Sequence, residues 1–161
     1  MAEVTNATVE DIPAIVDLWK ELFQYHKKLP GHKAVEIHQK TVSGADKLFA
    51  KWVRKNIKSA SGAVFVAKDG GHVVGYCLTN IKQNIPVFKI KRLGFLSDLY
   101  VKKSHRKMGF GKALQEQALR WFRKKGVRHI TLLVDAKNTN AVLAYKKWGF
   151  EDLYIEMRKK I

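Results

Sequence analysis

The feature that most constrains the fold is a continuous passage of strand, glycine-rich turn, helix and strand in the second half of the chain. The apolar run LGFLSDLYV predicts a central strand over residues 93–101. An amphipathic helix should follow from about Gly109 to Lys125, ended by Gly126, and a second strand is expected in HITLLVDA, residues 129–136. Two strands joined through a helix favour parallel pairing, so the passage predicts helices packed against a sheet.

Shorter patterns on either side complete one predicted domain over residues 1–161. The other expected elements are a strand at about Val4–Thr8, a helix from Ile12 that ends before Pro30, a helix at about Ala45–Lys58, a hairpin of AVFVA and HVVGYCLT, a basic loop at Lys82–Arg92, a helix at Asn138–Trp148 and a final strand at about Leu153–Lys159. The hairpin favours antiparallel pairing, whereas the later strand–helix–strand passages favour parallel pairing. The predicted class is therefore α/β, a mixed sheet with helices on both faces.

The positive charge is concentrated in the second half of the chain. Of the formal net charge of +17, +14 lies in residues 81–161. Such a field attracts polyanions, either nucleic acid or a phosphate-rich cofactor. A lysine-rich solvated surface is the alternative, so charge alone does not select a function.

The turn between the central strand and its helix, RKMGFGK at Arg106–Lys112, suits an anionic group. Its glycines allow the backbone to approach a ligand closely, and the helix start offers unpaired N–H groups and the positive end of the helix dipole. Lys107 and the two terminal residues of the turn add positive charge. These features predict a phosphate site.

Two common phosphate loops do not match this turn. A P-loop requires a glycine where Arg106 stands and a serine or threonine where Ala113 stands. A dinucleotide fingerprint requires a third glycine, which is replaced here by Leu114. What remains is the pattern Arg-x-x-Gly-x-Gly between a strand and a helix.

Two separated motifs together resemble one protein superfamily. The loop pattern is carried by Arg106, Gly109 and Gly111, and the later run NTNAVLAYKKWGF has an asparagine, an alanine, an aromatic residue and a Gly-Phe ending. These later residues are Asn138, Ala141, Tyr145, Gly149 and Phe150. With a helix and a strand between them, the motifs resemble the acyl-CoA loop and the later motif of the GNAT superfamily of N-acetyltransferases. The opening TNATVEDIPAIVDLW and the GHVVGY strand are similar to that superfamily too, so the resemblance covers nearly the whole chain.

The resemblance implies a three-layer αβα fold. Its central mixed sheet would splay apart at the acyl-CoA site, between the strand at Leu96–Val101 and the strand at Ile130–Asp135. The implied reaction is direct transfer of an acetyl group from the cosubstrate acetyl-CoA to an amine of a small molecule or of a protein or peptide. Neither a covalent enzyme intermediate nor a metal is expected.

The resemblance also implies roles for individual residues. Main-chain groups of three strand residues would bond the pantetheine arm and the thioester carbonyl, which is oxyanion-type stabilisation. The implied cofactor-binding set is Leu99, Tyr100, Val101, Arg106, Lys107, Met108, Gly109, Phe110, Gly111, Lys112, Asn138, Ala141 and Tyr145. Asn138 would combine this role with capping a helix. The hydroxyl of Tyr145 would protonate or hydrogen-bond the departing thiolate; the alternative is a core aromatic on an amphipathic helix.

The candidate proton acceptor departs from the superfamily's pattern. Many members place an acid nine positions before the loop arginine, and that position is Ser97 here. Asp98 should point to the opposite face of a regular strand, unless a β-bulge redirects it. Two interpretations of Asp98 stay open, a direct role in proton transfer or acceptor binding and a structural carboxylate bonded to nearby backbone.

The acceptor is expected to contact residues 25–44 and the loop Lys82–Arg92. Together these segments hold many cations, and Glu36 is their only acid. Such surroundings disfavour polyamines and favour neutral or anionic amines or an acidic peptide segment.

The remaining features bear on compartment and partners. Cys77 is the sole cysteine, which excludes an internal disulfide, and the histidines show no metal-ligand spacing. The first residues lack a signal-peptide pattern, and no apolar run approaches the roughly 20 residues of a membrane helix, which predicts a cytoplasmic protein without a membrane partner. A homodimer stays open. Two alternatives to an enzyme are an acyl-CoA-binding regulator without turnover and a basic module for nucleic acid or another anionic partner, although no base-reading motif supports the second.

Overall fold

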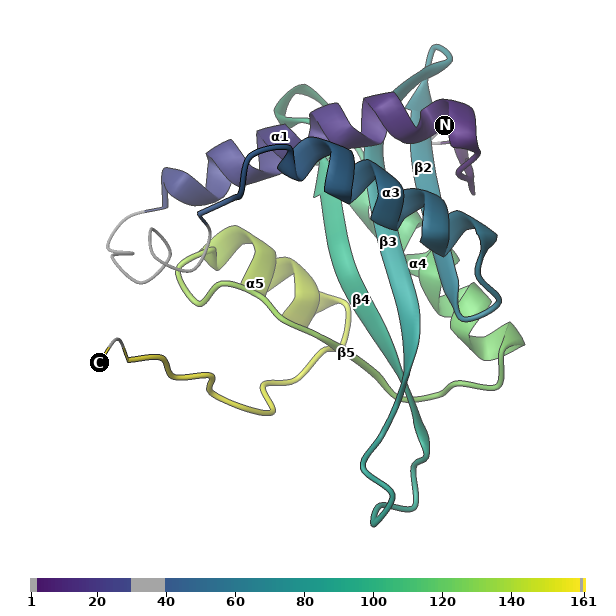
Figure 1. The fold of residues 1–161 in the computed structure, drawn as a ribbon, viewed down its shortest axis with the longest axis vertical. Coiled ribbons are helices and arrows are strands. Elements are labelled where there is room, and N and C mark those ends of the chain that lie inside the picture. Colours follow the sequence, from purple (N-terminus) through teal and green to yellow (C-terminus); the bar gives the residue numbers. More distant parts are fainter. Residues whose placement is uncertain (1–2, 30–39, 160) are drawn as a thin grey trace.

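A mixed five-stranded sheet lies at the centre of the computed structural model, which describes residues 3–29, 40–159 and 161 (Figure 1). Its strands are β1 (Glu3–Asn6), β2 (Gly62–Asp69), β3 (His72–Gln83), β4 (Arg92–Val101) and β5 (Ile130–Leu132). The helices are α1 (Ile12–Lys27), α3 (Ala45–Lys58), α4 (Phe110–Lys124) and α5 (Thr139–Lys147), with short 3-10 turns at Val9–Asp11 and Lys103–His105. Part of the segment expected to contact an acceptor, including Glu36, lies outside the described residues.

The strands follow one another in chain order across the sheet, and the mixed pairing predicted from the sequence is confirmed. Strands β1 to β4 pair antiparallel, whereas β4 and β5, joined through α4, pair in parallel. The parallel pairing is short, because it runs only from Gly94 opposite Ile130 to Leu96 opposite Leu132. Beyond Leu96, no strand in the described part of the chain pairs with this edge of β4, so the edge is open over Ser97–Val101.

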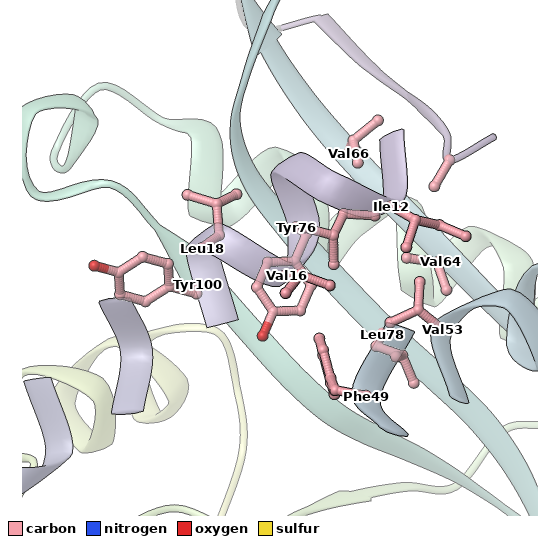
Figure 2. Packing of buried hydrophobic residues seen from close by; sticks show 12 residues of the cluster. Ile12, Val16, Leu18, Phe49, Val53, Val64, Val66, Tyr76, Leu78 and Tyr100 are labelled. Atoms are coloured by element: carbon pink, nitrogen blue, oxygen red, sulfur yellow. The ribbon is translucent and has the colours of Figure 1, made fainter. Parts of the chain in front are cut away.

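Helices cover both faces of the sheet and give the expected three layers. On one face, α1 and α3 bury Val16, Phe49 and Val53 against Tyr76 and other residues of β2 to β4 (Figure 2). On the other face, α4 packs a second apolar cluster against the sheet; its members include Leu114, Ala118, Phe122, Phe65, Cys77 and Leu96. The helix α5 lies on the open side of β4 (Figure 1). Burial of these stripes explains the helical spacing of the apolar residues.

The expected final strand at Leu153–Lys159 is wrong. This segment is assigned no strand, and Figure 1 shows it running away from the sheet. Leu153 is 72% exposed and Ile155 is 89% exposed. A strand needs a neighbouring edge with which its backbone groups can pair, and apolar composition alone does not provide one.

The strand expected at residues 129–136 is also shorter than predicted. Only Ile130–Leu132 pairs with β4, and the chain leaves the sheet before α5 begins. The apolar residues Leu133 and Val134, which suggested a longer strand, are 71% and 36% exposed. Within residues 3–29 and 40–159, no helix has the length and apolar character needed to cross a membrane.

Candidate functional site

The unpaired edge of β4 presents main-chain groups of alternate residues. The N–H of Lys102 donates to the carbonyl of Val74 in β3 at 2.8 Å, and a Cβ placed on Gly75 of β3 would lie 2.9 Å from the carbonyl oxygen of Tyr100. The main chain of Tyr100 therefore faces β3. Because backbone groups alternate along a strand, those of Leu99 and Val101 face the open edge. Leu99, Tyr100 and Val101 are the residues expected to offer main-chain groups to a ligand. The main-chain groups of Tyr100 point toward β3 and not toward the open edge, so Tyr100 does not fit this expectation.

The start of α4 lies beside this edge. Gly109 occupies the N-cap position with φ of 89°, and no side chain caps the helix. The N–H groups of the first helical turn, Phe110 to Lys112, have no partner within the helix. A Cβ placed on Gly111 would lie 3.6 Å from Trp148, the C-cap residue of α5, and 3.9 Å from Leu99. The helix start thus borders the gap between β4 and α5, where an anion would meet free donors and the positive dipole end.

The charged side chains of the loop point in different directions. The Nε of Arg106 donates to the carbonyl of Val101 at 3.1 Å, and its guanidinium lies 4.8 Å from the ring centre of Tyr25 in α1. Lys107 is exposed, with φ of 63°, and Lys112 is exposed and pairs with Glu116 at 3.6 Å. Arg106 therefore shapes the loop from within, whereas the two lysines supply charge at the surface.

The other two loop residues differ sharply in exposure. Met108 is 59% exposed, whereas the side chain of Phe110 is 4% exposed and belongs to the core under α4. Phe110 can therefore contribute only its main-chain N–H to a ligand. The sequence pattern alone does not show whether the side chain of Phe110 packs in the core or contacts a ligand.

A β-bulge in β4 redirects Asp98. Leu78 of β3 pairs with Asp98, but the next residue, Thr79, pairs with Leu96, so Ser97 is the extra residue. The bulge breaks the alternation of side chains, and both Ser97 and Asp98 lie on the face covered by α1 and α3. Two hydrogen bonds show this placement: the hydroxyl of Tyr76 donates to Oδ2 of Asp98 at 3.1 Å, and Nδ2 of Asn80 donates to Oγ of Ser97 at 2.9 Å.

The environment changes the proton affinity of Asp98. Burial raises the pKa of its carboxyl to about 6, although the hydrogen bond from Tyr76 opposes this shift. A carboxylate of this strength still ionises below neutral pH and binds a proton more readily than an ordinary aspartate. It therefore suits a general base.

Tyr145 and Cys77 share this neighbourhood. Burial raises the pKa of Tyr145, and the nearby Cys77 and Asp98, which are both negative when ionised, raise it further. Burial, together with Asp98, also raises the pKa of Cys77. The ring of Tyr145 lies edge-on to Trp148, with ring centres 5.7 Å apart. Both groups therefore stay protonated near neutral pH, which makes Tyr145 a proton donor and Cys77 a poor nucleophile.

Asn138 joins α5 to α1 across the open side of β4. Its Oδ1 accepts a hydrogen bond from the N–H of Ala141 at 3.3 Å, as a helix N-cap does. The same oxygen accepts one from the hydroxyl of Tyr25 at 3.2 Å. The capping role expected for Asn138 is confirmed, and Ala141 contributes its main-chain N–H to it.

A hollow of about 600 Å³ opens on the α3 side of the sheet, directly beside Asp98. Its lining comes from α3, the turn that follows α3, β3 and β4: Trp52, Lys55, Asn56, Ser59, Ser61, Asn80, Ile81, Lys82, Phe95, Ser97 and Asp98. The Oδ1 of Asn80 is buried with no hydrogen-bond partner. Of this lining, the sequence pointed only to Lys82, Ser97 and Asp98. The missed signal is Asn80, a polar residue that closely follows the apolar run Val73–Leu78 in β3.

No metal centre is built into this region. Among the residues that the structure describes, no group of three His, Cys, Asp or Glu side chains is arranged to hold a metal ion. His105, next to the loop, instead lies 3.4 Å from the carboxylate of Asp69.

Known proteins share this sequence pattern and architecture. The profile of the Acetyltransferase (GNAT) family matches residues 15–150. An uncharacterized N-acetyltransferase of Methanocaldococcus jannaschii is 29% identical over 127 residues, which cover 73% of this chain and 55% of that protein. The chain thus spans about half the length of this relative.

Two solved structures show the same fold. The BH1408 protein of Bacillus halodurans superposes with a TM-score of 0.83 at 20% identity, covering 99% of each chain. The aminoglycoside N-acetyltransferase AAC(6')-Iy, solved with the bisubstrate analogue CoA-S-monomethyl-acetylneamine, gives a TM-score of 0.74 at 21% identity, covering 100% of this chain and 99% of the other.

Proposed function

Because the chain belongs to the acetyltransferase (GNAT) family, we propose that it transfers the acetyl group of acetyl-CoA to the nitrogen of an amine. The observation that carries this proposal is the open edge of β4 beside the uncapped start of α4. The edge offers main-chain groups to an extended, amide-containing arm, and the helix start offers N–H groups to phosphates. Acetyl-CoA has both parts in one molecule.

The cosubstrate supplies an activated acetyl group as a thioester, and the chain's own residues hold it. The first turn of α4, with the surface charge of Lys107 and Lys112, would bind the pyrophosphate. The main-chain groups of Leu99 and Val101 would bond the pantetheine arm. An N–H group on this edge that also points at the thioester oxygen would stabilise the negative charge that develops there.

Asp98 and Tyr145 would divide the two proton transfers. The carboxylate of Asp98 takes a proton from the ammonium form of the acceptor, and the free amine attacks the thioester carbon. A carbon–nitrogen bond forms, the carbon–sulfur bond breaks, and the hydroxyl of Tyr145 gives a proton to the departing thiolate. The nitrogen loses its second proton as the amide forms, and this proton restores the hydroxyl of Tyr145. The shifted pKa values of both groups favour these opposite roles near neutral pH.

Thiol release from acetyl-CoA in the presence of a panel of amines tests this proposal. We expect release that depends on both substrates and a product whose mass shows one added acetyl group. Binding of CoA, measured by calorimetry, serves as the reference for a folded cofactor site. CoA binding without thiol release from any amine would contradict the enzyme and leave an acyl-CoA-binding regulator.

The acceptor amine is not identified by the family. One structural relative is an aminoglycoside N-acetyltransferase, whose substrates are amines. At 21% identity this likeness establishes the fold alone. The acceptor has to be inferred from the lining of the hollow beside Asp98.

A further inference from the structure

The hollow on the α3 side of the sheet has the size and position of a small-molecule site. Its volume of about 600 Å³ lies within the usual range for ligand pockets, and it opens to solvent between α3 and the strands β3 and β4. Asp98 forms part of its wall, so a ligand in the hollow reaches the proposed base. The hollow lies on one face of the sheet, and the open edge of β4 lies next to it.

Asn80 leaves one hydrogen-bonding atom in the wall unused. Its Nδ2 donates to Ser97 at 2.9 Å, whereas its Oδ1 is buried without a partner. A buried acceptor atom without a donor is unfavourable, so this position calls for a donor from a ligand. An amine or ammonium group supplies such a donor. The carboxylate of Asp98 lies in the same wall, where it can pair with the positive charge of the ammonium.

The charges around the hollow are unequal. Lys55 of α3 and Lys82 of β3 both line it and are exposed, and the ammonium of Lys82 lies 3.7 Å from the ring centre of Phe95. Among the described residues that line the hollow, Asp98 is the sole carboxylate. One positive charge on a ligand can therefore pair with Asp98, whereas additional positive charges are repelled by Lys55 and Lys82.

The walls between these charges are apolar. The rings of Trp52 and Phe95 line the hollow, and Trp52 is 38% exposed, whereas the side chain of Ile81 packs into the cluster under α4 on the other face. Aromatic surfaces of this kind bind a hydrocarbon or aromatic portion of a ligand. The lining thus combines a place for one ammonium, an apolar middle and two cations at the rim.

We infer that the acceptor is a small primary amine that also carries a carboxylate, in the manner of an amino acid with an apolar side chain. Its ammonium group lies toward Asp98 and Asn80, and its carboxylate lies toward Lys55 and Lys82. This inference rests on the proposed function, because it assigns the acceptor of the same reaction. It excludes polycationic acceptors such as polyamines and aminoglycosides.

A matched pair of acceptors tests the inference. The pair is an apolar amino acid and its carboxamide, which share a carbon skeleton and differ in the negative charge, with spermidine and an aminoglycoside as polycationic probes. We expect kcat/KM to favour the carboxylate over the carboxamide by roughly fivefold or more, as for a charge contact at an exposed rim. Lys55→Met and Lys82→Met should each reduce this ratio, mainly through KM for the carboxylate.

Lys51→Met is the control, because Lys51 lies exposed on the same helix and does not line the hollow. It should leave the ratio unchanged. Equal use of acid and carboxamide, better use of the polycations, or a ratio unaffected in both lining variants would overturn the inference.

Binding separates failure of the site from failure of the reaction. Calorimetry in the presence of CoA should show tighter binding of the amino acid than of its carboxamide, and Lys55→Met should remove the difference. If no amine releases thiol but this binding difference is present, the proposed reaction is wrong and the assignment of the hollow stands. If binding shows no difference, the assignment of the hollow is wrong.

Discussion

The hydroxyl of Tyr76 donates a 3.1 Å hydrogen bond to the carboxylate of Asp98, two residues that face each other from neighbouring strands because a bulge lies between Leu96 and Asp98. In a regular strand without the bulge, Asp98 would lie on the same face as Leu96, toward α4 and away from the hollow. The bulge thus directs the carboxyl group of Asp98 toward the hollow. Four of the following predictions depend on this pair or on its neighbour Tyr145.

Asp98→Asn should reduce turnover by about 100-fold or more, the usual contribution of a general base. The active form of Asp98 is the carboxylate, which dominates above the pKa of about 6. In the native protein, kcat/KM should therefore fall as the pH decreases through about 6, and this limb should disappear in the variant. A pH–rate profile with unchanged CoA affinity checks the prediction. A variant of undiminished activity would assign Asp98 a structural role.

The same substitution should stabilise the fold at pH 8. The folded-state pKa of about 6 lies above the ordinary value of 3.8, so the carboxyl favours folding when it is neutral and loses this contribution as the pH rises through about 6. Asparagine stays neutral at every pH. We expect a gain of about 1 to 3 kcal/mol in the free energy of unfolding at pH 8 and a much smaller difference near pH 4. Urea denaturation at pH 8 and pH 4 measures the free energy of unfolding of both proteins. An equal gain at both pH values would contradict the raised pKa of Asp98.

Tyr76→Phe should move the acid limb of the pH–rate profile upward. The hydrogen bond from Tyr76 stabilises the charged form of Asp98, and its loss should raise the pKa of Asp98 by up to about one unit. Tyr100→Phe is the control, because the hydroxyl of Tyr100 donates to Glu21 at 3.2 Å and not to Asp98. The limb should stay in place in the control. A shift of equal size in both variants would indicate a general effect of removing a hydroxyl.

Tyr145→Phe should reduce turnover at least tenfold, or by about 1.4 kcal/mol of barrier, with little change in CoA affinity. The reason is the loss of the proton donor to the thiolate, since burial keeps the hydroxyl of Tyr145 protonated. Steady-state kinetics and calorimetry with CoA separate the two effects. Unchanged turnover would remove Tyr145 from the reaction, whereas lost CoA affinity would make it a packing residue of the cofactor site.

Gly109→Ala should weaken CoA binding and destabilise the fold. Gly109 has φ of 89°, which an alanine adopts only with strain of about 1 to 2 kcal/mol, and its relaxation would displace the first turn of α4. Gly44→Ala is the matched control, because Gly44 is the N-cap of α3 with φ of 73° and likewise has no atom near its Cβ position. Both variants should lower the free energy of unfolding, but only Gly109→Ala should weaken CoA binding. Equal CoA affinity in both would argue against a phosphate site at α4.

Local patterns of the sequence were sufficient to predict most of the framework. The passage from β4 through α4 to β5 follows from periodicity and glycine placement, and so does the glycine-rich start of α4. The capping role of Asn138 could also be anticipated, because it depends on residues within one turn. Such features require only neighbours along the chain.

The features that the sequence did not predict depend on partners distant in the chain. The bulge at Ser97 is set by the register between β3 and β4, and the orientation of the Tyr100 main chain depends on its pairing with β3. The hollow combines Trp52, Asn80 and Phe95, which come from three elements. The expected strand at Leu153–Lys159 failed for the same reason, since strand propensity cannot show whether a free edge lies within reach.

Transfer of an isotopically labelled acetyl group from acetyl-CoA tests the reaction most directly. The native protein, acetyl-CoA labelled in the acetyl group and the panel of amines would be incubated together, and both the amines and the protein would be analysed by mass spectrometry. We predict one labelled acetyl group on the amine nitrogen for each CoA thiol released, and no label on the protein, because the Cys77 thiol is buried and protonated. Label retained on the protein, or CoA bound without any labelled amine, would contradict direct acetyl transfer.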